Sequence, residues 1–376
     1  MGMRLLEWYN NGDEDQFKKI FGLRIIQRKK YAHCAMHITN FKFHITPIGV
    51  ILDIERICSC PYKRTAAFCI MKERRLKLNE NRRMNMVDLI LFPSSFFSIE
   101  KVDEDLQREY DAVVSTGLFD VTFFGYDQWI NEGQLVVKDV FEEMRSAVYR
   151  GWMMKPKQYE QLYYLLLEKN IRLITNPEEY RELHVFPNVY KHLVEDTASM
   201  EIYPLHSQID VEQLKKRFKR FMVKDYVKSV KGTEFPRYFD STVTQEEFDQ
   251  WMEVFYAYRG DLLTGGICIK EFLSLKYYGS RTNEYRVFYI NHEPATISRN
   301  SGQGIYTQAP PQALINKYKE LNSPYYTVDY AELEDGTWRV VEAGDGGVSG
   351  LSENQDYEQY FRALYQCFAE TERLLD

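Results

Sequence analysis

The sequence predicts an α/β layer over residues 86–195, followed by two further units of mixed strands and helices. Three observations lead to this class. Strand-like apolar runs alternate with amphipathic helical runs up to residue 195, a pattern typical of a parallel sheet. Hairpin patterns replace that alternation in the last hundred residues. A chain of 376 residues is long enough for two or three domains.

Each element of the α/β layer has its own signal. Strands are expected at 86–95, 121–126, 146–150 and 171–175, and helices at 102–116, 156–170 and 177–192. The layer lacks the glycine fingerprint of dinucleotide-binding sheets. Arg150 follows the third strand, and ligands of parallel sheets bind at the carboxyl ends of strands. Arg150 is therefore a candidate anion-binding residue, although an exposed surface arginine explains the pattern equally well.

The second unit, residues 200–272, contains a strand expected at 221–229 with two lysines on one face. Lys224 and Lys228 are four residues apart, which places both on the same side of an extended strand. Phosphate oxygens are natural partners of two such ammonium groups, but two solvated lysines fit the pattern as well. A helix is expected at 244–259, where Thr244 and Glu247 have the spacing of a capping box. An apolar strand follows at 266–275.

The third unit contains a hairpin at 284–298, a helix at 311–321, a second hairpin at 325–342 and a closing helix at 357–375. A turn centred on Asp335 and Gly336 sets the register of the second hairpin. Counting back from that turn pairs Leu333 with Trp338, Ala331 with Val340 and Asp329 with Glu342, all on one face. Four of these six residues are apolar, so the face is expected to be buried.

Asp329 and Glu342 would then face each other about 5 Å apart, which requires a positive group between them. A divalent cation that carries nucleotide phosphates is one solution, because Mg²⁺ prefers carboxylate oxygens. In the other solution, one carboxylate is solvated and its neighbour meets a lysine or arginine. The stretch from Gly344 to Gly350 follows directly, and its glycines allow backbone N–H groups to approach an anion. This favours a metal–phosphate site.

Bulk composition narrows the classes further. The net charge of −7 combines a basic segment, residues 1–85 with 17 Lys and Arg against 8 Asp and Glu, with an acidic remainder. Nucleic-acid binding is therefore expected only, if at all, of the first 85 residues. No apolar run is long enough to span a membrane, and irregularly spaced cysteines indicate a cytoplasmic protein.

The basic segment is expected to be an extension of unknown role, and Met84 or Met86 is a candidate true start. A zinc site is disfavoured by the spacing of its ligand-type residues, and a run of charges is more often a solvated helix face than a nucleic-acid contact. These residues are His33, Cys34, His37, Cys58, Cys60 and Cys69, and the charge run is 72–83.

From Met86 onward, the chain resembles the ATP-grasp superfamily, in particular a group of uncharacterised ATP-grasp proteins. The resemblance rests on LILFPSSFFSIEKVDEDLQREYDAV, AVYRGWMMKPKQYEQLY, FMVKDYVKS, GGICIKEFLSL, EYRVFYINHE and VDYAELEDGTWRVVEAGDGGVSGL, in that order. It implies an ATP-grasp fold: a Rossmann-like α/β domain at 86–197, a small α+β lobe at 198–272 and a C-terminal α+β lobe at 273–376, with ATP held between the lobes.

The resemblance also implies roles for individual residues. Lys224 and Lys228 would contact ATP phosphates, and Arg286 would meet the γ-phosphate or an acyl phosphate. The stretch Lys270, Glu271 and Phe272 would lie beside the adenine. Asp329 and Glu342 would hold Mg²⁺. Many family members carry Asn where this chain has Gly344, so Asp345 is a candidate third ligand and the number of Mg²⁺ ions is open. Arg150 and Ser349 are candidates for substrate contact.

The function implied is an ATP-dependent carboxylate–amine ligase that forms an acyl phosphate and releases ADP, with ATP and Mg²⁺ as cofactors. Its partners would be small-molecule or peptide carboxylates and amines; the oligomeric state is open. The alternative is an ATP-binding regulatory module without turnover, which the departure at Gly344 motivates. No Ser/His/Asp or Cys/His set appears, and the scattered histidines receive no role.

Overall fold

The computed structural model of the chain describes residues 43–46, 49–52 and 87–373. The chain divides into two compact units, Met1–Leu76 and Lys77–Asp376. In the first unit, β1 (Phe43–Thr46) pairs antiparallel with β2 (Gly49–Leu52). The ligand-type cysteines and histidines, the charge run at 72–83 and the candidate start methionines of the basic segment lie outside the described residues.

The second unit begins with the parallel sheet that the sequence predicts. β3 (Val87–Ser95) lies between β5 (Asp120–Phe124) and β6 (Arg145–Tyr149), and β6 pairs with β7 (Ile171–Leu173), all in parallel. β4 (Ser98–Val102) folds back antiparallel on the end of β3. Most of β3 is buried, as a strand covered on both faces must be. Whether this sheet is a separate Rossmann-like domain with a boundary at residue 197 stays a prediction.

Helices cover the parallel sheet, and two of them begin or end where the sequence did not predict. The elements are η2 (Glu104–Leu106), α5 (Gln107–Thr116), α6 (Tyr126–Glu132), α7 (Pro156–Glu168), α8 (Pro177–His184) and α9 (Phe186–Leu193). The helix expected at 102–116 starts late, because Val102 ends β4 and Asp103 caps a short 3₁₀ turn. The helix expected at 177–192 is two helices, because Val185 between them has extended backbone angles.

A four-stranded antiparallel sheet, called the small sheet, follows in the order β10-β9-β11-β8. Its strands are β8 (Met200–Tyr203), β9 (Arg220–Asp225), β10 (Phe239–Asp240) and β11 (Ile267–Glu271), and its helices are α10 (Val211–Arg217), α11 (Gln245–Arg259) and η3 (Gly260–Leu262). Thr244 and Glu247 form the predicted capping box at the start of α11. Phe221, Phe239, Phe248 and Phe255 fill the core between this sheet and its helices.

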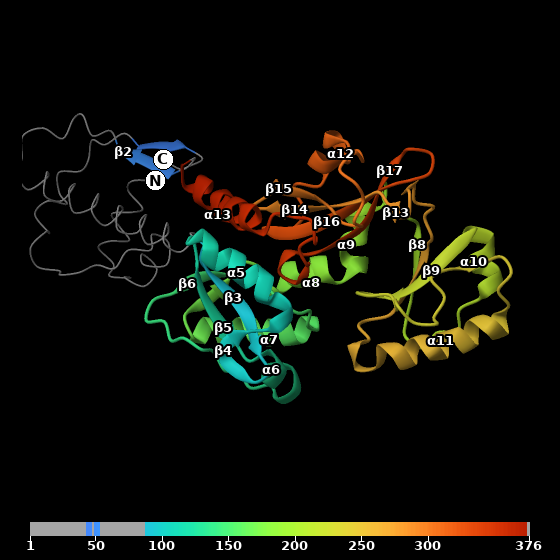
Figure 1. The fold of residues 1–376 in the computed structure, drawn as a ribbon, viewed down its shortest axis with the longest axis horizontal. Coiled ribbons are helices and arrows are strands. Elements are labelled where there is room, and N and C mark those ends of the chain that lie inside the picture. Colours follow the sequence, from blue (N-terminus) through green and yellow to red (C-terminus); the bar gives the residue numbers. More distant parts are fainter. Residues whose placement is uncertain (1–42, 47–48, 53–86, 374–376) are drawn as a thin grey trace, which may run out of the picture. The chain divides into compact units, whose positions relative to one another are not determined.

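A second antiparallel sheet, called the large sheet, has the order β15-β14-β16-β17. It contains both predicted hairpins: β14 (Glu284–Ile290) with β15 (Glu293–Arg299), and β16 (Tyr325–Glu332) with β17 (Trp338–Asp345). The remaining elements are β12 (Tyr277–Tyr278), β13 (Arg281–Thr282), α12 (Gln312–Lys317), η4 (Gly346–Val348) and α13 (Tyr357–Arg373). Figure 1 shows the small sheet and the parallel sheet on either side of α8 and α9.

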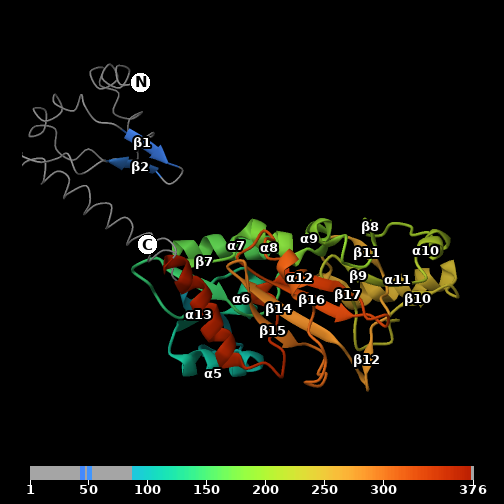
Figure 2. The same cartoon turned by 90° about the horizontal axis from the view of Figure 1, so that it is seen from above.

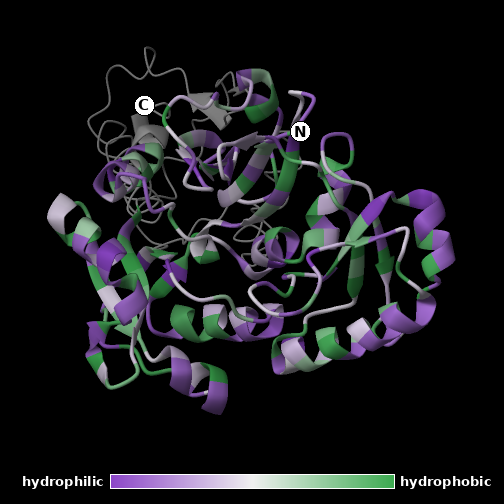
Figure 3. Cartoon of the chain, turned by 45° about the vertical axis from the view of Figure 1, so that its right-hand side comes forward, coloured by the Kyte–Doolittle hydropathy of each residue, from purple (hydrophilic) through white to green (hydrophobic). Residues whose placement is uncertain are grey.

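The closing helix α13 connects the large sheet to the parallel sheet. It packs along α5 and β15 (Figure 2), and Tyr360, Phe361 and Leu364 enter a core shared with β3 and β14. Figure 3 shows hydrophobic residues along the strands and hydrophilic residues on the outer turns of the helices. None of the helices in the described residues combines the length and apolar character needed to cross a membrane.

Candidate functional site

The predicted carboxylate pair forms at the centre of the large sheet. Asp329 on β16 pairs with Glu342 on β17, as the turn-based register predicts. Arg286 on β14 pairs with Asp329 from the other side, so three charged side chains lie abreast on one face. The Arg286 Nε and Nη2 atoms donate to the two Asp329 carboxylate oxygens at 2.8 and 2.7 Å. This bidentate pair neutralises Asp329 and fixes the guanidinium plane.

A β-bulge corrects the rest of the predicted register. Val340 pairs with Tyr330, and Ala331 pairs with Arg339, so the predicted pairing of Ala331 with Val340 is wrong. Val341 is the extra residue of the bulge, and the shift turns Val340 into the apolar core with Tyr330. The face of Asp329 and Glu342 is therefore not the apolar face that the alternation predicted.

The bulge also presents two acceptors to the small sheet. Lys270 on β11 donates from Nζ to the Val341 carbonyl oxygen at 2.6 Å. Lys224 on β9 donates from Nζ to Glu342 Oε1 at 3.2 Å. Both ammonium groups lie over the ring of Phe186, 4.6 Å from its centre for Lys224 and 4.3 Å for Lys270. The two lysines and the aromatic face form a cation–π cluster where the two sheets meet.

Lys228 reaches the same place by a route that the sequence did not indicate. The strand expected at 221–229 ends at Asp225, so the prediction that Lys224 and Lys228 share a strand face is wrong. Asp225 is fully buried, and its Oδ1 accepts from the backbone N–H groups of Val227 and Lys228 at 2.6 and 2.7 Å. Arg259 holds the other carboxylate oxygen at 2.8 Å. This turn directs the chain back, and Lys228 lines the carboxylate pocket.

The three lysines determine the charge state of the site. Burial alone would raise the pKa of Glu342, but Lys224, Lys228 and Lys270 outweigh it and lower the pKa to about 2. Burial lowers the pKa of Lys270 to about 7, helped by Lys224 and opposed by Glu342. Burial also lowers the pKa of Lys228, with Glu342 opposing it. At neutral pH the Glu342 carboxylate is therefore ionised.

These groups surround a small pocket of about 90 Å³. It brings together predicted residues from three parts of the chain: Lys228, Arg286, Asp329, Glu342, Asp345 and Ser349. Val227, Met153 and His184 complete the wall. Ser349 is held in place because its hydroxyl donates to the Asp345 carbonyl oxygen at 2.7 Å and bonds to the Thr327 hydroxyl at 2.9 Å.

Asp345 does not join the other two carboxylates. It pairs with Tyr326, which places its side chain on the opposite face of β17 from Glu342. Its Oδ1 accepts from the Gly347 N–H at 2.9 Å, its Oδ2 is buried, and burial raises its pKa to about 7. Among the residues that the structure describes, no group of three or more His, Cys, Asp or Glu could hold a metal ion. Its role as a third ligand stays a prediction.

Arg150 is not the surface residue that one interpretation of the sequence proposed. Only 2% of it is exposed, and it forms a bidentate pair with Glu109. Its Nη1 donates to the Tyr325 hydroxyl and to the carbonyl oxygens of Gly346 and Ser349. These bonds fasten the loop that carries η4 to the parallel sheet. Substrate contact by Arg150 stays a prediction.

The predicted adenine-side residues lie at the end of β11. The Glu271 carboxylate accepts from the Ser199 N–H at 3.3 Å. Phe272 packs against Tyr238 with ring centres 4.6 Å apart, and the Arg220 guanidinium lies 5.2 Å from the Phe272 ring. A larger pocket of about 550 Å³ opens beside these rings. It offers room for a flat ring next to Phe272.

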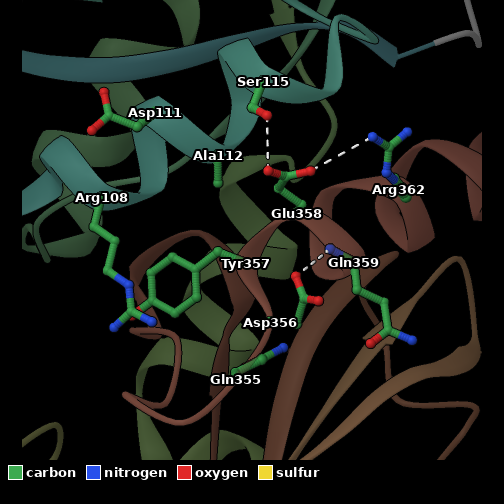
Figure 4. Close-up of a pocket in the computed structure, with 10 residues that line it drawn as sticks. All are labelled: Arg108, Asp111, Ala112, Ser115, Gln355, Asp356, Tyr357, Glu358, Gln359 and Arg362. Carbon is green, nitrogen blue, oxygen red and sulfur yellow. Dashed lines mark hydrogen bonds and ion pairs between the residues drawn. The ribbon is translucent and has the colours of Figure 1, made fainter.

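A further hollow of about 760 Å³ lies between α5 and the start of α13 (Figure 4). Its charged groups are engaged within the hollow. Glu358 accepts from the Ser115 hydroxyl at 2.8 Å and pairs with Arg362 at 3.6 Å, while Arg108 stacks over the Tyr357 ring at 4.0 Å. This arrangement fastens the two helices, and we assign the hollow no catalytic role.

Sequence reasoning missed His184, Phe186 and Asp225. Asp225 had a detectable signal, because an Asp two and three residues before other backbone N–H groups is typical of an Asx turn. His184 and Phe186 had none, because they precede the small sheet and reach the site only through the packing of α8 and α9 against β17.

The fold has known relatives among solved structures. The D-alanine–D-alanine ligase of Coxiella burnetii is similar with a TM-score of 0.52 at 12% identity, over 77% of this chain and 96% of that chain. The ATP-grasp ligase PsnB, solved with a minimal precursor, has a TM-score of 0.50 at 10% identity, over 75% and 99%. A RimK domain ATP-grasp protein of Sphaerobacter thermophilus has a TM-score of 0.50 at 12% identity, over 75% and 100%.

At these identities the likeness concerns the fold alone, and that fold is the ATP-grasp fold, so this chain contains an ATP-grasp domain. Residues 213–364 match a family model of the ATP-grasp domain, the third family of its clade. That stretch includes Lys224, Arg286, Asp329 and Glu342. No curated protein matches the chain.

Proposed function

We propose that the protein is an ATP-dependent carboxylate–amine ligase that releases ADP and phosphate. One observation carries the proposal. On the fold of known ligases, a single pocket gathers two carboxylates, a bidentate arginine and a lysine, and a second lysine contacts one of those carboxylates. This combination of charges suits the binding of a metal–triphosphate complex.

The donor set fits Mg²⁺ through two residues. Asp329 and Glu342 are adjacent across strands, and 40% of the Glu342 side chain is exposed, so it is open to a ligand. Carboxylate oxygens are the ligands that Mg²⁺ prefers, and it commonly takes one or two of them together with substrate phosphates. When bound, Mg²⁺ would neutralise charge on the phosphates. The ammonium group of Lys224 and the guanidinium of Arg286 would be free to contact phosphate oxygens.

The proposed reaction has two steps. A substrate carboxylate oxygen attacks the γ-phosphorus, and the bond from that phosphorus to the bridging oxygen breaks, giving an acyl phosphate and ADP. An amine nitrogen then attacks the acyl carbon, phosphate leaves, and the nitrogen loses a proton. The protein needs no nucleophile of its own, because Lys228 and Arg286 align and neutralise the transferring group.

The base end of the nucleotide is proposed to lie at the end of β11. The backbone of Lys270, Glu271 and Phe272 leads from the cation–π cluster to the 550 Å³ pocket beside Phe272. An adenine ring there would contact an aromatic face, and the phosphates would extend toward Lys224. Small-molecule or peptide acids and amines are the proposed substrates, and a cytoplasmic location is proposed with them.

The test is ADP release from Mg·ATP over a panel of carboxylates crossed with amines. We expect one combination to raise ADP release above the level with ATP alone. The second candidate, a module that binds ATP without turnover, is favoured by the carboxylates already paired with Arg286 and Lys224 and by Gly344. Tight binding of Mg·ATP without ADP release from any combination would support that candidate and contradict the ligase.

A further inference from the structure

His184 ends α8, and the start of that helix determines which side chains point inward. Asn176 accepts from the backbone N–H groups of Glu178 and Glu179, and the Glu179 carboxylate accepts from the Asn176 N–H. This capping box fixes the phase of the helix. Tyr180 and His184, four residues apart, therefore lie on its buried face.

A stack of three rings sets the orientation of the imidazole. Tyr159 and Tyr180 are parallel with centres 3.8 Å apart, and the His184 ring continues the stack 4.7 Å from Tyr180. Both phenols are fixed, because Tyr180 donates to the Met154 carbonyl oxygen at 2.8 Å and Tyr159 to that of Thr175 at 2.8 Å. The ring of His184 therefore has little freedom to turn.

The polar atoms of that imidazole are not engaged by the described part of the protein. His184 is 7% exposed, and it lines the small pocket together with Lys228, Arg286, Asp329 and Glu342. Its ring has no hydrogen bond or ion pair within residues 87–373, the part of this unit that the structure describes. A buried polar group without a partner is costly, and such groups in native proteins usually await a ligand or water.

The neighbours of His184 keep it neutral. Burial lowers its pKa to about 3, with Lys228 and Lys224 adding to the effect and Glu342 opposing it. A neutral imidazole carries one N–H donor and one acceptor nitrogen. Because the surrounding lysines attract anions to the pocket, the ligand atom nearest this donor is expected to be an anionic oxygen.

We propose that His184 is a further catalytic residue, whose imidazole N–H donates a hydrogen bond to an oxygen of the terminal phosphate of bound ATP. The inference rests on the proposed function, since it requires nucleotide in this pocket. The ring stack would hold the donor in place before the phosphate arrives, and such preorganised donors stabilise charge that develops during phosphoryl transfer.

The experiment compares the affinities of Mg·AMP-PNP and Mg·ADP by calorimetry in wild type, His184→Phe and His184→Gln. The phenyl ring keeps the stack on Tyr180 but lacks the donor, whereas the glutamine amide supplies one. We expect His184→Phe to bind Mg·AMP-PNP roughly tenfold to hundredfold more weakly, the range for a hydrogen bond to a charged group, with Mg·ADP unchanged. His184→Gln should recover part of the loss.

The matched control is His192→Phe, because the His192 side chain is 47% exposed and pairs with Glu182 outside the pocket. It should bind both nucleotides as wild type does. An equal loss of both nucleotides in His184→Phe, or no loss of either, would overturn the role of His184 while leaving the proposed function intact. Failure of wild type to bind either nucleotide would reject the proposed function, and the inference with it.

Discussion

Replacing Arg150 with methionine tests whether this residue is part of the framework of the protein. Only 2% of its side chain and 8% of that of Glu109 are exposed. The substitution leaves Glu109 as a buried, unpaired charge, and breaking such a pair costs about 3–5 kcal/mol. The Gly346 and Ser349 carbonyls lose their donor as well, at about 1 kcal/mol each. We therefore expect a loss of about 4–6 kcal/mol in the free energy of unfolding.

The double variant Arg150→Met with Glu109→Leu removes the stranded charge. It should regain the part due to Glu109 and retain a deficit of about 2 kcal/mol from the two carbonyls. Urea-induced unfolding, followed by far-UV circular dichroism and by tryptophan fluorescence, measures each free energy. Arg145→Met is the control, because Arg145 pairs with the partly exposed Asp88 and Asp120 and should cost about 1 kcal/mol or less.

Two results would refute this reasoning. A loss below about 1 kcal/mol for Arg150→Met would show that the buried pair does not stabilise the fold. A double variant no more stable than the single one would show that the unpaired Glu109 carboxylate was not the cause. If Arg150 acts only on the framework, refolded Arg150→Met should bind Mg·ADP as wild type does.

Three other outcomes are expected. Glu342→Gln and Asp329→Asn should each abolish Mg²⁺-dependent ADP formation without unfolding the protein, and wild-type turnover in both would reject the metal assignment. Burial raises the Asp345 pKa from 3.8 to about 7, so the folded state binds more protons than the unfolded state between those values. Stability is then lost as pH rises from about 4 to 7, by up to ~1.4 kcal/mol per pH unit, and Asp345→Asn should remove that component; identical urea profiles against pH for both proteins would contradict it. Gly266→Ala would place a Cβ 2.3 Å from the Tyr203 carbonyl oxygen and should lower the free energy of unfolding by about 1–3 kcal/mol or more; an unchanged thermal midpoint would show that the strand can shift freely.

Local chemistry predicted the central pair because it depends on few residues. The pairing of Asp329 with Glu342 is confirmed, although the route to it was partly wrong. The count from Asp335 and Gly336 assumed unbroken alternation and a two-residue turn, whereas β16 and β17 end at Glu332 and Trp338 and a bulge occurs at Val341. The longer turn and the bulge compensate for each other. A bulge has no reliable signal in one sequence, because the packing of Val340 decides it.

Long-range packing explains what the sequence could not predict. Lys228 leaves the strand because Arg259, more than thirty residues later, pairs with the buried Asp225. Arg150 looked like an exposed loop residue, since nothing near it in sequence indicates Glu109 as a partner. The alternation of strands and helices, by contrast, predicted the parallel sheet correctly, because each of its elements carries its own apolar pattern.

The two ion pairs of the site have a consequence for how ligands enter it. Lys224 pairs with Glu342 and Arg286 with Asp329, so the cations and anions cancel. A nucleotide that enters alone must draw a cation away from a carboxylate and strand that carboxylate beside its own negative charge. A metal ion that enters alone strands the cation instead. Arriving together, they exchange partners with no charge left over, so each is expected to strengthen the binding of the other by the same factor.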